Sequence, residues 1–305
     1  MKGKDFLSIT DLEPDEVSQM VSKAREMKNT GVPRLLDGKT VALIFEKPSL
    51  RTRVSFEVGV QQMGGTCIYL SPMDIGELGV REPVSDVARV LDRLVDVIVA
   101  RVFDHESLAT LAAETDIPVV NALSDLAHPC QVLGDLITMS EVKGRLEGLR
   151  VAYIGDGNNI ASSLALGCAS VGADFVIAAP SDYHVPSDAW EEARRRAFEK
   201  ESLLEWVEDP KRAVDGADVV YTDVWISMGD ESEADERRRV FSQYQVNEDL
   251  MELADGGAVF MHDMPAHRGE EVSEGILDHK SSVVYAQAEN RLHAQNAILT
   301  ELLLR

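Results

Sequence analysis

The segment Ser49-Leu50-Arg51-Thr52-Arg53 concentrates chemical groups that bind anions. It follows an apolar, strand-like run at residues 41–45 and opens a helical pattern. Two guanidinium groups, two hydroxyls and free backbone N–H groups thus gather at a helix N-terminus, which carries partial positive charge and suits a phosphate or another oxyanion. Arg51 and Arg53 lie on different sides of a helix. We therefore expect one of them to face the ligand and the other to hold a carboxylate of the scaffold.

Three further positions carry groups suited to the same kind of ligand. Arg101 ends an apolar strand pattern at residues 97–102, and an arginine buried there needs an anionic partner. His128 and Gln131 open a helical pattern and together can donate to one oxygen and bind an amide; the alternative is a helix-capping histidine beside a surface glutamine. Arg291 lies on the last helical pattern, where an arginine is ordinarily a solvated charge.

Carboxylates follow two strand patterns in the second half of the chain. Asp223 comes directly after an apolar run at residues 219–222. Asp263 comes just after a similar run at residues 258–261. Both are therefore expected at the carboxyl ends of strands, where open α/β sheets bind small ligands.

The turn Gly155-Asp156-Gly157 follows the strand pattern of residues 151–154 and matches part of a dinucleotide-binding motif. The motif is incomplete, because Ile160 occupies the third glycine position. The next strand ends in Ala179-Pro180, with no acidic residue to bind a ribose. We therefore expect no nicotinamide cofactor, and we interpret the segment as a tight turn at the ligand-binding end of a sheet.

Helical and strand patterns alternate along almost the whole chain, which predicts an α/β protein with mainly parallel sheets flanked by helices. A length of 305 residues suits two domains. We place the boundary between residues 147 and 148. The strand patterns of the first half lie at residues 41–45, 66–70, 97–102 and 118–122, and those of the second half at residues 151–154, 175–179, 219–222 and 258–261.

The composition excludes several classes of partner. A formal net charge of −23 argues against nucleic acid and anionic membranes, because both require a basic surface. Hydrophobic residues make up 45% of the chain, as in a globular protein. There is no apolar run of about 18 residues and no signal-peptide core, so we expect a soluble, cytoplasmic protein. In so acidic a chain, the positive charge that an anionic ligand needs must be concentrated locally.

The three cysteines, Cys67, Cys130 and Cys168, do not have the spacing of metal ligands. Their odd number argues against a disulfide framework. Cys67 lies in a strand pattern and Cys168 in a helical one, and both are expected to be small packing residues. We predict no metal site and no cofactor.

Seven short segments resemble one protein family when they are read in order. They are SxRTR, ARVF, HPCQ, GDGNN, DVWxSMG, HxxPAHRGEE and ENRxHAQ. Over nearly the whole chain this order closely resembles the aspartate/ornithine carbamoyltransferases. The loop from Asp223 to Ser227-Met228-Gly229 resembles the ornithine branch of that family. The resemblance implies transfer of a carbamoyl group from carbamoyl phosphate to the δ-amine of L-ornithine, giving citrulline and phosphate in arginine metabolism.

The resemblance assigns the phosphate of carbamoyl phosphate to the first segment and the last helix. Backbone amides of this segment would share in binding the phosphate. Attack on carbamoyl phosphate builds negative charge on the departing phosphate, so positioned donors are expected to supply much of the catalysis. The residues implied are Ser49, Leu50, Arg51, Thr52 and Arg291.

A second group is implied to bind the carbamoyl end of the same substrate. Arg101 would bridge the phosphate and the carbonyl oxygen, and His128 would polarise that oxygen together with Thr52. Gln131 would contact the carbamoyl NH₂. The family pattern also places Asp263 and Met264 at this substrate.

The acceptor site implied by the resemblance is a clamp for ornithine, formed by Asn159, Asp223, Ser227 and Met228. Asp223 would meet the α-ammonium group, and amide and backbone donors would meet the α-carboxylate. The attacking δ-amine must be neutral, although an amine of this kind has a pKa near 10. Some group must accept its proton, and the departing phosphate is one candidate. The catalytic residues implied are Arg51, Arg101, His128, Asp223 and Asp263.

The resemblance also implies how the chain is organised. Residues 1–147, together with a C-terminal helix at residues 287–305 that packs back on them, would form the carbamoyl-phosphate-binding domain. Residues 148–286 would form the ornithine-binding domain. The family assembles as trimers, so a homotrimer or an assembly of trimers is expected. The resemblance does not distinguish the biosynthetic from the catabolic direction.

Asp263 is the most consequential departure from the family pattern. Many ornithine enzymes have His-Cys-Leu-Pro where this chain has His262-Asp263-Met264-Pro265. Two nearby carboxylates, Asp223 and Asp263, either share a proton, with one pKa raised, or require a dicationic ligand such as ornithine. Alternatively, Asp263 is itself the general base.

Two other departures concern the phosphate side. Leu50 replaces the usual threonine, and we expect its side chain to face away from the ligand while its backbone amide remains. Gly76 or Glu77 stands where ornithine enzymes often have a glutamine that reaches into a neighbouring subunit. A carboxylate at that position cannot donate to a phosphate.

Two alternatives to the ornithine reaction stay open at this point. One is a carbamoyltransferase for another amine, such as putrescine or an acylated ornithine; Asp223 argues against these, because it suits a free α-ammonium group. The other is a non-catalytic relative. The intact anion-binding set argues against a scaffold, since a scaffold has no need for it.

Overall fold

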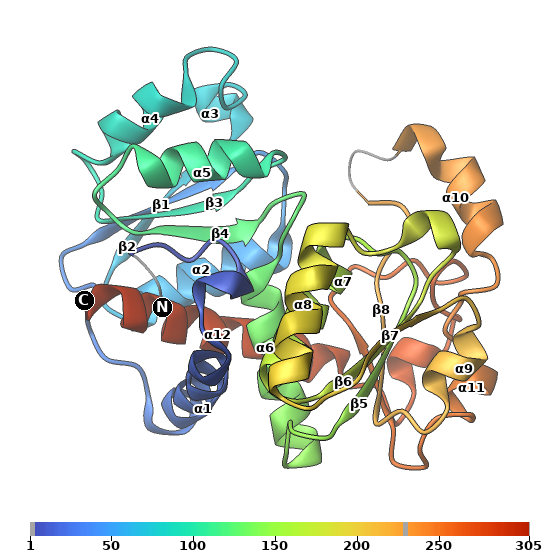
Figure 1. Cartoon of the computed structure of the whole chain (residues 1–305). Coiled ribbons are helices and arrows are strands. Elements are labelled where there is room, and N and C mark those ends of the chain that lie inside the picture. Colours follow the sequence, from blue (N-terminus) through green and yellow to red (C-terminus); the bar gives the residue numbers. More distant parts are fainter. Residues whose placement is uncertain (1–3, 228–230, 305) are drawn as a thin grey trace. The chain divides into compact units, whose positions relative to one another are not determined.

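The alternating pattern builds two separate parallel β-sheets (Figure 1). The structure is a computed structural model that describes residues 4–227 and 231–304. By its internal contacts the chain divides into unit 1, which comprises Met1–Ile137 and Glu289–Arg305, and unit 2, which comprises Thr138–Ala288. The division falls inside two helices, α6 (Pro129–Lys143) and α12 (Val284–Leu303). The predicted α/β class with two parallel sheets is confirmed.

Unit 1 has a four-stranded sheet in the order β2-β1-β3-β4, with all neighbours parallel. The two central strands are buried along almost their whole length, as expected for a parallel sheet covered on both faces. The elements of unit 1 are η1 (Ile9–Asp11), α1 (Pro14–Thr30), β1 (Thr40–Phe45), α2 (Leu50–Gln62), β2 (Thr66–Leu70), α3 (Pro72–Ile75), α4 (Val84–Leu91), β3 (Val97–Arg101), α5 (His105–Ala113), β4 (Val119–Leu123) and the beginning of α6.

Helix α12 returns to unit 1, as the sequence predicted. Lys23 of α1 forms an ion pair with Glu301 at 2.9 Å. Asn296 donates to Gln62 of α2 at 3.1 Å. Gly134 of α6 lies so close to α12 that a Cβ added to it would stand 3.1 Å from the backbone nitrogen of Arg291, so the absence of a side chain permits this contact. Contacts with α1, α2 and α6 therefore fix the helix that carries Arg291.

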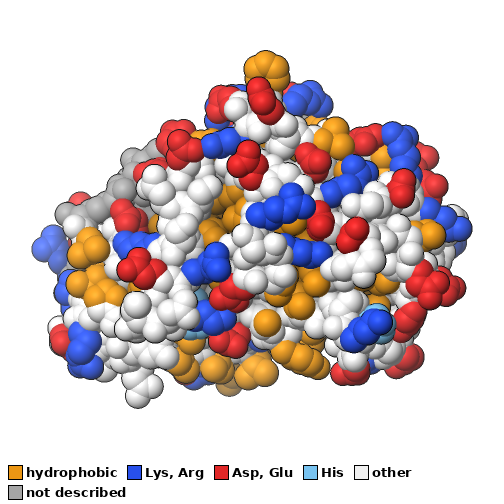
Figure 2. All heavy atoms as spheres, turned by 90° about the horizontal axis from the view of Figure 1, so that it is seen from below, with side chains coloured by type: hydrophobic (Ala, Val, Ile, Leu, Met, Phe, Trp, Pro, Cys, Tyr) orange, Lys and Arg blue, Asp and Glu red, His pale blue; other side chains and the backbone are white. Residues whose placement is uncertain are grey.

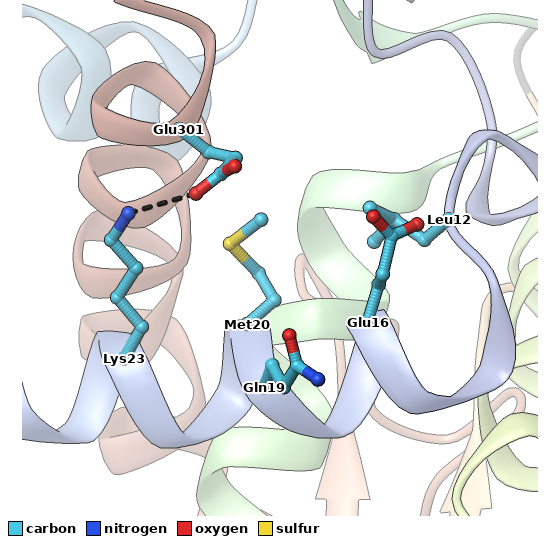
Figure 3. Close-up of a pocket in the computed structure, with 6 residues that line it drawn as sticks. All are labelled: Leu12, Glu16, Gln19, Met20, Lys23 and Glu301. Atoms are coloured by element: carbon cyan, nitrogen blue, oxygen red, sulfur yellow. Dashed lines mark hydrogen bonds and ion pairs between the residues drawn. The ribbon is translucent and has the colours of Figure 1, made fainter. Parts of the chain in front are cut away.

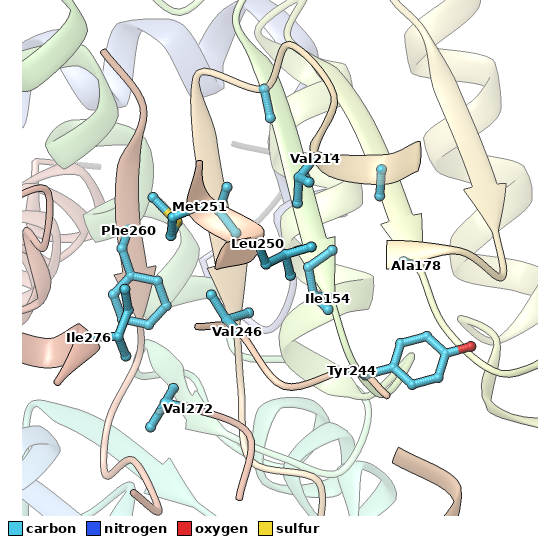
Figure 4. Packing of buried hydrophobic residues seen from close by; sticks show 14 of the residues in the cluster. Ile154, Ala178, Val214, Tyr244, Val246, Leu250, Met251, Phe260, Val272 and Ile276 are labelled. Atoms are coloured by element: carbon cyan, nitrogen blue, oxygen red, sulfur yellow. The ribbon is translucent and has the colours of Figure 1, made fainter. Parts of the chain in front are cut away.

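Unit 2 has a five-stranded parallel sheet in the order β7-β6-β5-β8-β9. Side chains from the sheet and from the helices around it pack into the core shown in Figure 4, among them Ile154, Val214 and Phe260. The elements are β5 (Arg150–Ile154), α7 (Asn159–Ser170), β6 (Asp174–Ala178), η2 (Ser181–Tyr183), α8 (Ser187–Glu199), β7 (Leu204–Val207), α9 (Pro210–Val214), β8 (Val219–Thr222), η3 (Glu231–Glu233), α10 (Ala234–Phe241), α11 (Glu248–Met251), β9 (Val259–His262) and η4 (Ile276–Asp278).

Each sheet changes direction of winding between two neighbouring strands. In unit 1 the change falls between β1 and β3, because β2 lies on one side of β1 and β3 with β4 on the other. In unit 2 it falls between β5 and β8. At such a switch point the connections that leave the two strands diverge and open a crevice for ligands. The fold thus offers one binding position at the carboxyl end of each sheet.

Ion pairs on the surface offset part of the net charge of −23. Figure 2 shows acidic and basic side chains interspersed on the face it displays. On α8 such neighbours form ion pairs three residues apart, for example Arg194 with Glu191 at 2.7 Å. Exposed pairs of this kind contribute about 0.5 kcal/mol each and do not determine the fold. Within the described residues, none of the helices combines the length and the apolar character needed to span a bilayer.

Candidate functional site

The predicted anion-binding segment forms the start of α2, directly after β1. Ser49 is the N-cap of this helix: its hydroxyl accepts from the Thr52 backbone N–H at 3.3 Å and donates to the Thr52 hydroxyl at 2.9 Å. Thr52 is buried and Arg51 is partly buried. Arg53 instead points outward, pairs with Glu57 at 2.8 Å and stacks on the ring of Tyr69. Arg53 is thus the scaffold arginine, which leaves Arg51 as the arginine for a ligand.

Leu50 lies between these residues with its side chain turned outward. It is 74% exposed, as expected for a position that offers only its backbone to a ligand. Gly76 has a positive φ of 79° and ends the short helix α3, and Glu77 follows it in the connection to α4.

Arg101, His128 and Gln131 lie at the same end of the unit 1 sheet. Arg101 is the last residue of β3 and is paired in register with Phe45, the last residue of β1, across the switch point. His128 precedes α6 and Gln131 lies in its first turn; all three side chains are buried. The Gln131 amide donates to Asp135 at 2.8 Å, while its carbonyl oxygen accepts no hydrogen bond from the described residues.

Arg291 of α12 completes this group. It is 2% exposed, and one of its terminal nitrogens donates to the Thr52 hydroxyl. Thr52 is thereby held by Ser49 from its own helix and by Arg291 from a helix about 240 residues further along the chain. Three arginines, a histidine and a helix N-terminus therefore meet at one end of the four-stranded sheet, an arrangement suited to a doubly charged oxyanion.

The carboxylates meet at the corresponding end of the unit 2 sheet. The strand register places Thr222 beside Ile154 and His262, so the residues that follow these strands are neighbours. Asp223 is buried, and its two oxygens accept from the Asn158 side-chain amide and from the Val224 backbone N–H, both at 2.7 Å. Burial, followed by the neighbouring Asp263 carboxylate, raises the pKa of Asp223 well above its ordinary value.

His262 links these carboxylates to a third one. Its Nε2 lies 3.2 Å from Glu271 and its Nδ1 lies 3.3 Å from Asp263. Burial works against the charged ring, but the hydrogen bonds to Asp263 and Glu271 outweigh it and raise the pKa of His262 to about 9. The Met264 backbone N–H lies 2.8 Å from Nδ1 and donates to it when the ring is neutral. When the ring gains a proton at Nδ1, this nitrogen can no longer accept from Met264 and instead donates to Asp263.

Two groups of described residues have the spacing of metal ligands. In Asp223, His262 and Asp263 the ligand atoms lie within 4.8 Å of one another, and the same holds for His267, Glu270 and Glu271. In the first group both ring nitrogens of His262 already have partners, which leaves no lone pair for a metal. In the second group Glu270 pairs with Arg238 at 3.1 Å. The donor chemistry suits the holding of protons and ammonium groups.

The remaining predicted acceptor residues lie around the same sheet end. Asn159 is the first residue of α7 and is partly buried, as is Ser227 in the connection after β8. Met264, which is predicted to contact carbamoyl phosphate, is partly buried and has a positive φ of 61°. Met228, the fourth predicted contact, lies outside the residues that the structure describes.

Sequence reasoning assigned no role to two residues that support this group, Asn158 and Glu271. Asn158 caps α7 and also donates to Asp223, a double role that its position after the glycine turn could have indicated. Glu271 is fully buried and accepts from His262 and from the His267 backbone. It is the second glutamate of the segment HRGEE, and nothing in the sequence distinguishes it from the first.

Two cavities lie apart from these residues. One, of about 260 Å³, lies in unit 1 between α1 and α12 and is shown in Figure 3; it is lined by Leu12, Glu16, Gln19, Met20, Lys23 and Glu301. The other, of about 680 Å³, lies in unit 2 beside Tyr183 and the residues 232–236. None of the described site residues lines either cavity.

The fold and the two sheet ends define a class of two-unit α/β proteins with one arginine-rich and one carboxylate-rich sheet end, an arrangement suited to one anionic and one cationic small molecule. Comparison with known families makes this class specific. Residues 4–141 match the carbamoyl-P binding domain of the aspartate/ornithine carbamoyltransferases, and residues 147–302 match the Asp/Orn binding domain of the same family. The chain belongs to the aspartate/ornithine carbamoyltransferase family.

Its relatives include several ornithine carbamoyltransferases. The chain is 52% identical to that of Hyperthermus butylicus, over 99% of this chain and 98% of the relative, and 48% identical to that of Bacillus subtilis, over 99% and 95%. Among solved structures it resembles the ornithine carbamoyltransferase of Pyrococcus furiosus with a TM-score of 0.93 and 47% identity, over 97% of this chain and 96% of that one.

Proposed function

We propose that the chain transfers the carbamoyl group of carbamoyl phosphate to the δ-amine of L-ornithine and releases citrulline and phosphate. The δ-nitrogen attacks the carbonyl carbon, so that a C–N bond forms and the C–O bond to phosphate breaks. The nitrogen loses one proton in the process. The observation that carries the proposal is the opposite charge of the two sheet ends, one rich in arginine and the other in carboxylates, in a chain about 50% identical to ornithine carbamoyltransferases.

At the unit 1 sheet end, Ser49, Arg51, Thr52 and the first amides of α2, including that of Leu50, bind the phosphate, with Arg291 beside them. The burial of Thr52 between Ser49 and Arg291 supports this assignment. The negative charge that develops on the leaving phosphate is then met by donors that are already in place, which is the main source of rate enhancement in such a reaction.

The carbamoyl end of this substrate contacts a second set of residues. Arg101 bridges the phosphate and the carbonyl oxygen, and His128 donates to that oxygen. The carbonyl of Gln131 accepts from the carbamoyl NH₂; its unused acceptor, in a fully buried side chain, supports this role. Asp263 and Met264 contribute from the connection after β9.

At the unit 2 sheet end, Asp223 binds the α-ammonium group of ornithine, and Asn159, Ser227 and Met228 bind the rest of its amino-acid end. Asp263 lies close to Asp223 and faces the same cationic substrate. Either Asp263 or the departing phosphate takes the proton of the δ-nitrogen. His262, held by Glu271, stabilises the charged form of Asp263.

The organisation that accompanies this function is also proposed. Residues 1–147 with 287–305 bind carbamoyl phosphate, and residues 148–286 bind ornithine. The limits of the two family matches support a boundary near residue 147, and the contacts of α12 with α1 and α2 support its place in the first domain. We place the protein in the cytoplasm, as a homotrimer or an assembly of trimers. The anabolic ornithine carbamoyltransferase of Pyrococcus furiosus, 48% identical, supports a role in arginine biosynthesis.

Citrulline formation from carbamoyl phosphate and ornithine tests the proposal. Putrescine, N-acetylornithine and aspartate serve as competing acceptors, and the assay covers pH 6 to 10. Turnover confined to ornithine is the expected result. Turnover with a different amine alone, or with none, contradicts the proposal.

A second candidate function rests on Asp263. A carboxylate in place of the family's usual cysteine changes the acceptor side, and one relative of known structure, an N-acetyl-L-ornithine transcarbamylase mutant, is 30% identical with a TM-score of 0.89. The candidate is a carbamoyltransferase for putrescine or an acylated ornithine. The Asp263→Cys variant separates the two functions: under the ornithine proposal it keeps ornithine as its acceptor.

A further inference from the structure

Arg237 is a buried arginine of unit 2 that has no part in the proposed chemistry. It lies on α10 and is 9% exposed. One terminal nitrogen donates to the Asp156 carboxylate at 2.8 Å and to the backbone carbonyl of Trp225 at 3.1 Å, and its Nε lies 3.3 Å from Glu233. Burial of a guanidinium group is costly, so these contacts must offset the lost hydration.

The partners of Arg237 come from both connections at the switch point. Asp156 belongs to the turn after β5, and Trp225 to the connection after β8. The same two connections are also tied by the hydrogen bond from Asn158 to Asp223 at 2.7 Å. Two sets of hydrogen bonds therefore join these connections. One involves Asp223 itself, and the other, formed by Arg237, involves Trp225, two residues further along the chain.

The hydrogen bonds of Arg237 constrain the backbone that leads to Ser227. The guanidinium group holds the carbonyl oxygen of Trp225, two residues before Ser227. The indole ring of Trp225 is held independently, because it stacks on Phe241 with ring centroids 6.2 Å apart. Removal of the guanidinium group thus leaves the ring packed in the core and frees the backbone oxygen, so the direct consequence falls on the segment that carries Ser227.

Close packing fixes the turn after β5, which carries Asp156. A Cβ added to Gly157 would stand 2.3 Å from the backbone carbon of His184 and 2.3 Å from the backbone nitrogen of Val185. The Gly157 N–H donates to the carbonyl of Tyr183, whose ring lies 5.1 Å from the Arg237 guanidinium carbon. Asp156 is therefore a rigid anchor, and Arg237 transmits its position to Trp225.

We propose that Arg237 is a positioning residue for the amino-acid acceptor: it ties the Trp225 carbonyl to Asp156 and so holds Asp223 and Ser227 at the spacing that the acceptor requires. The inference rests on the proposed function, because it assigns Asp223 and Ser227 to ornithine. Arg237 itself touches neither substrate in this account.

Steady-state kinetics of three variants test the inference. Arg237→Gln is expected to raise the KM for ornithine at least tenfold while the KM for carbamoyl phosphate stays within twofold of wild type. Arg237→Lys keeps a charge for Asp156 but lacks the Nε that pairs with Glu233 and the planar group that fixes the direction of the donors, so an intermediate KM is expected. Arg238→Gln is the matched control: this neighbour is half-exposed, pairs with Glu270, and should behave as wild type.

A fourth variant identifies the anchor. Asp156→Asn is expected to raise the KM for ornithine as Arg237→Gln does, and the double variant should show little further increase, because both changes break the same link. If Arg237→Gln fails to fold, the Arg237→Lys and Asp156→Asn variants carry the test.

Three outcomes contradict the inference. An unchanged KM for ornithine in a folded Arg237→Gln variant overturns it while the proposed function stands. An equal rise in both KM values together with a lower Tm assigns Arg237 a merely structural role and also overturns it. If the wild-type enzyme forms no citrulline from ornithine, the proposed function fails and this inference fails with it.

Discussion

The carboxyl ends of the two sheets use the same architecture for opposite charges. In each unit a buried parallel sheet changes direction between two central strands, and the polar residues follow those strands. In unit 1 they include Arg51 and Arg101, and Arg291 of α12 lies beside them. In unit 2 they include Asp223 and Asp263. The fold therefore supplies the position of a ligand, and a few residues at the strand ends decide its charge.

The two sheet ends also differ in how the repulsion between their like charges is reduced. The unit 1 arginines come from three separate elements, β3, α2 and α12, and neutral groups such as the Thr52 hydroxyl lie among them. In unit 2 the carboxylates lie within 4.8 Å of His262 and of each other, so they share protons instead. We therefore expect the unit 1 site to bind an anion without a change of protonation, and the unit 2 carboxyl groups to give up a proton when an ammonium group binds.

The largest effect is expected at the unit 1 sheet end. Arg101→Gln removes a buried guanidinium group that meets developing charge, and we expect kcat/KM to fall by about 10³-fold. Arg53→Gln provides the matched control, because Arg53 is exposed and paired with Glu57; its activity should stay within twofold of wild type. Equal losses of kcat/KM in the two variants would show that the net positive charge of this region, and not the position of each arginine, determines anion binding.

The corresponding change in unit 2 is Asp223→Asn. The substitution keeps the shape of the side chain but removes the charge that pairs with an ammonium group, so we expect kcat/KM for ornithine to fall by about 10²-fold. The change should fall mainly on the KM for ornithine. A KM for carbamoyl phosphate that rises to the same extent would contradict the separation of the two sites.

A smaller effect concerns the pH dependence of ornithine binding. Because burial and Asp263 raise the pKa of Asp223, the empty pair of carboxyl groups holds a proton where an exposed aspartate has lost it. An ammonium group must displace this proton, so the KM for ornithine should fall as the pH rises. In Asp263→Asn the neighbouring charge is absent, and the dependence measured between pH 6 and pH 8 should become flatter. Parallel profiles for both enzymes would refute shared protonation.

The smallest effect is expected on stability. His262 has a pKa of about 9 in the folded chain, against about 6.5 in an unfolded chain. A group with a raised pKa adds its full contribution to the free energy of unfolding when the pH is below its pKa in the unfolded chain. This contribution is lost as the pH rises through its pKa in the folded chain, and for His262 it amounts to roughly 3 kcal/mol. The Tm of wild type should therefore exceed that of His262→Gln by several degrees more at pH 6 than at pH 9.5. A difference that does not vary with pH argues against a charged ring.

Much of the architecture was predictable from sequence, because both sheets are made of buried parallel strands. Such strands are continuous apolar runs, and polar residues stop them abruptly, as Asp223 does after β8. Strand β7 (Leu204–Val207) escaped prediction, since it is a short edge strand that contains a glutamate and is mostly half-exposed. Helix α12 begins at Val284, three residues before the predicted start.

The candidate site was predictable to the extent that single segments carry chemistry. The distinction between Arg51 and Arg53 follows from helical geometry alone, and the structure shows Arg53 paired with Glu57. The supporting contacts were not predictable, because they join positions far apart in the sequence. Arg237 illustrates this: its partner Asp156 lies 81 residues away, and neither residue type indicates the other.

The return of α12 to unit 1 governs when the anion site forms during synthesis. Unit 1 is assembled from the chain before residue 138 and the chain after residue 288, so all of unit 2 leaves the ribosome between its two parts. A nascent chain that has exposed Ser49, Arg101 and His128 still lacks Arg291, the partner of Thr52. Unit 2 is contiguous and can fold first, in keeping with domain-wise folding. The set of residues proposed to bind carbamoyl phosphate is thus complete only in chains whose unit 2 has already been made.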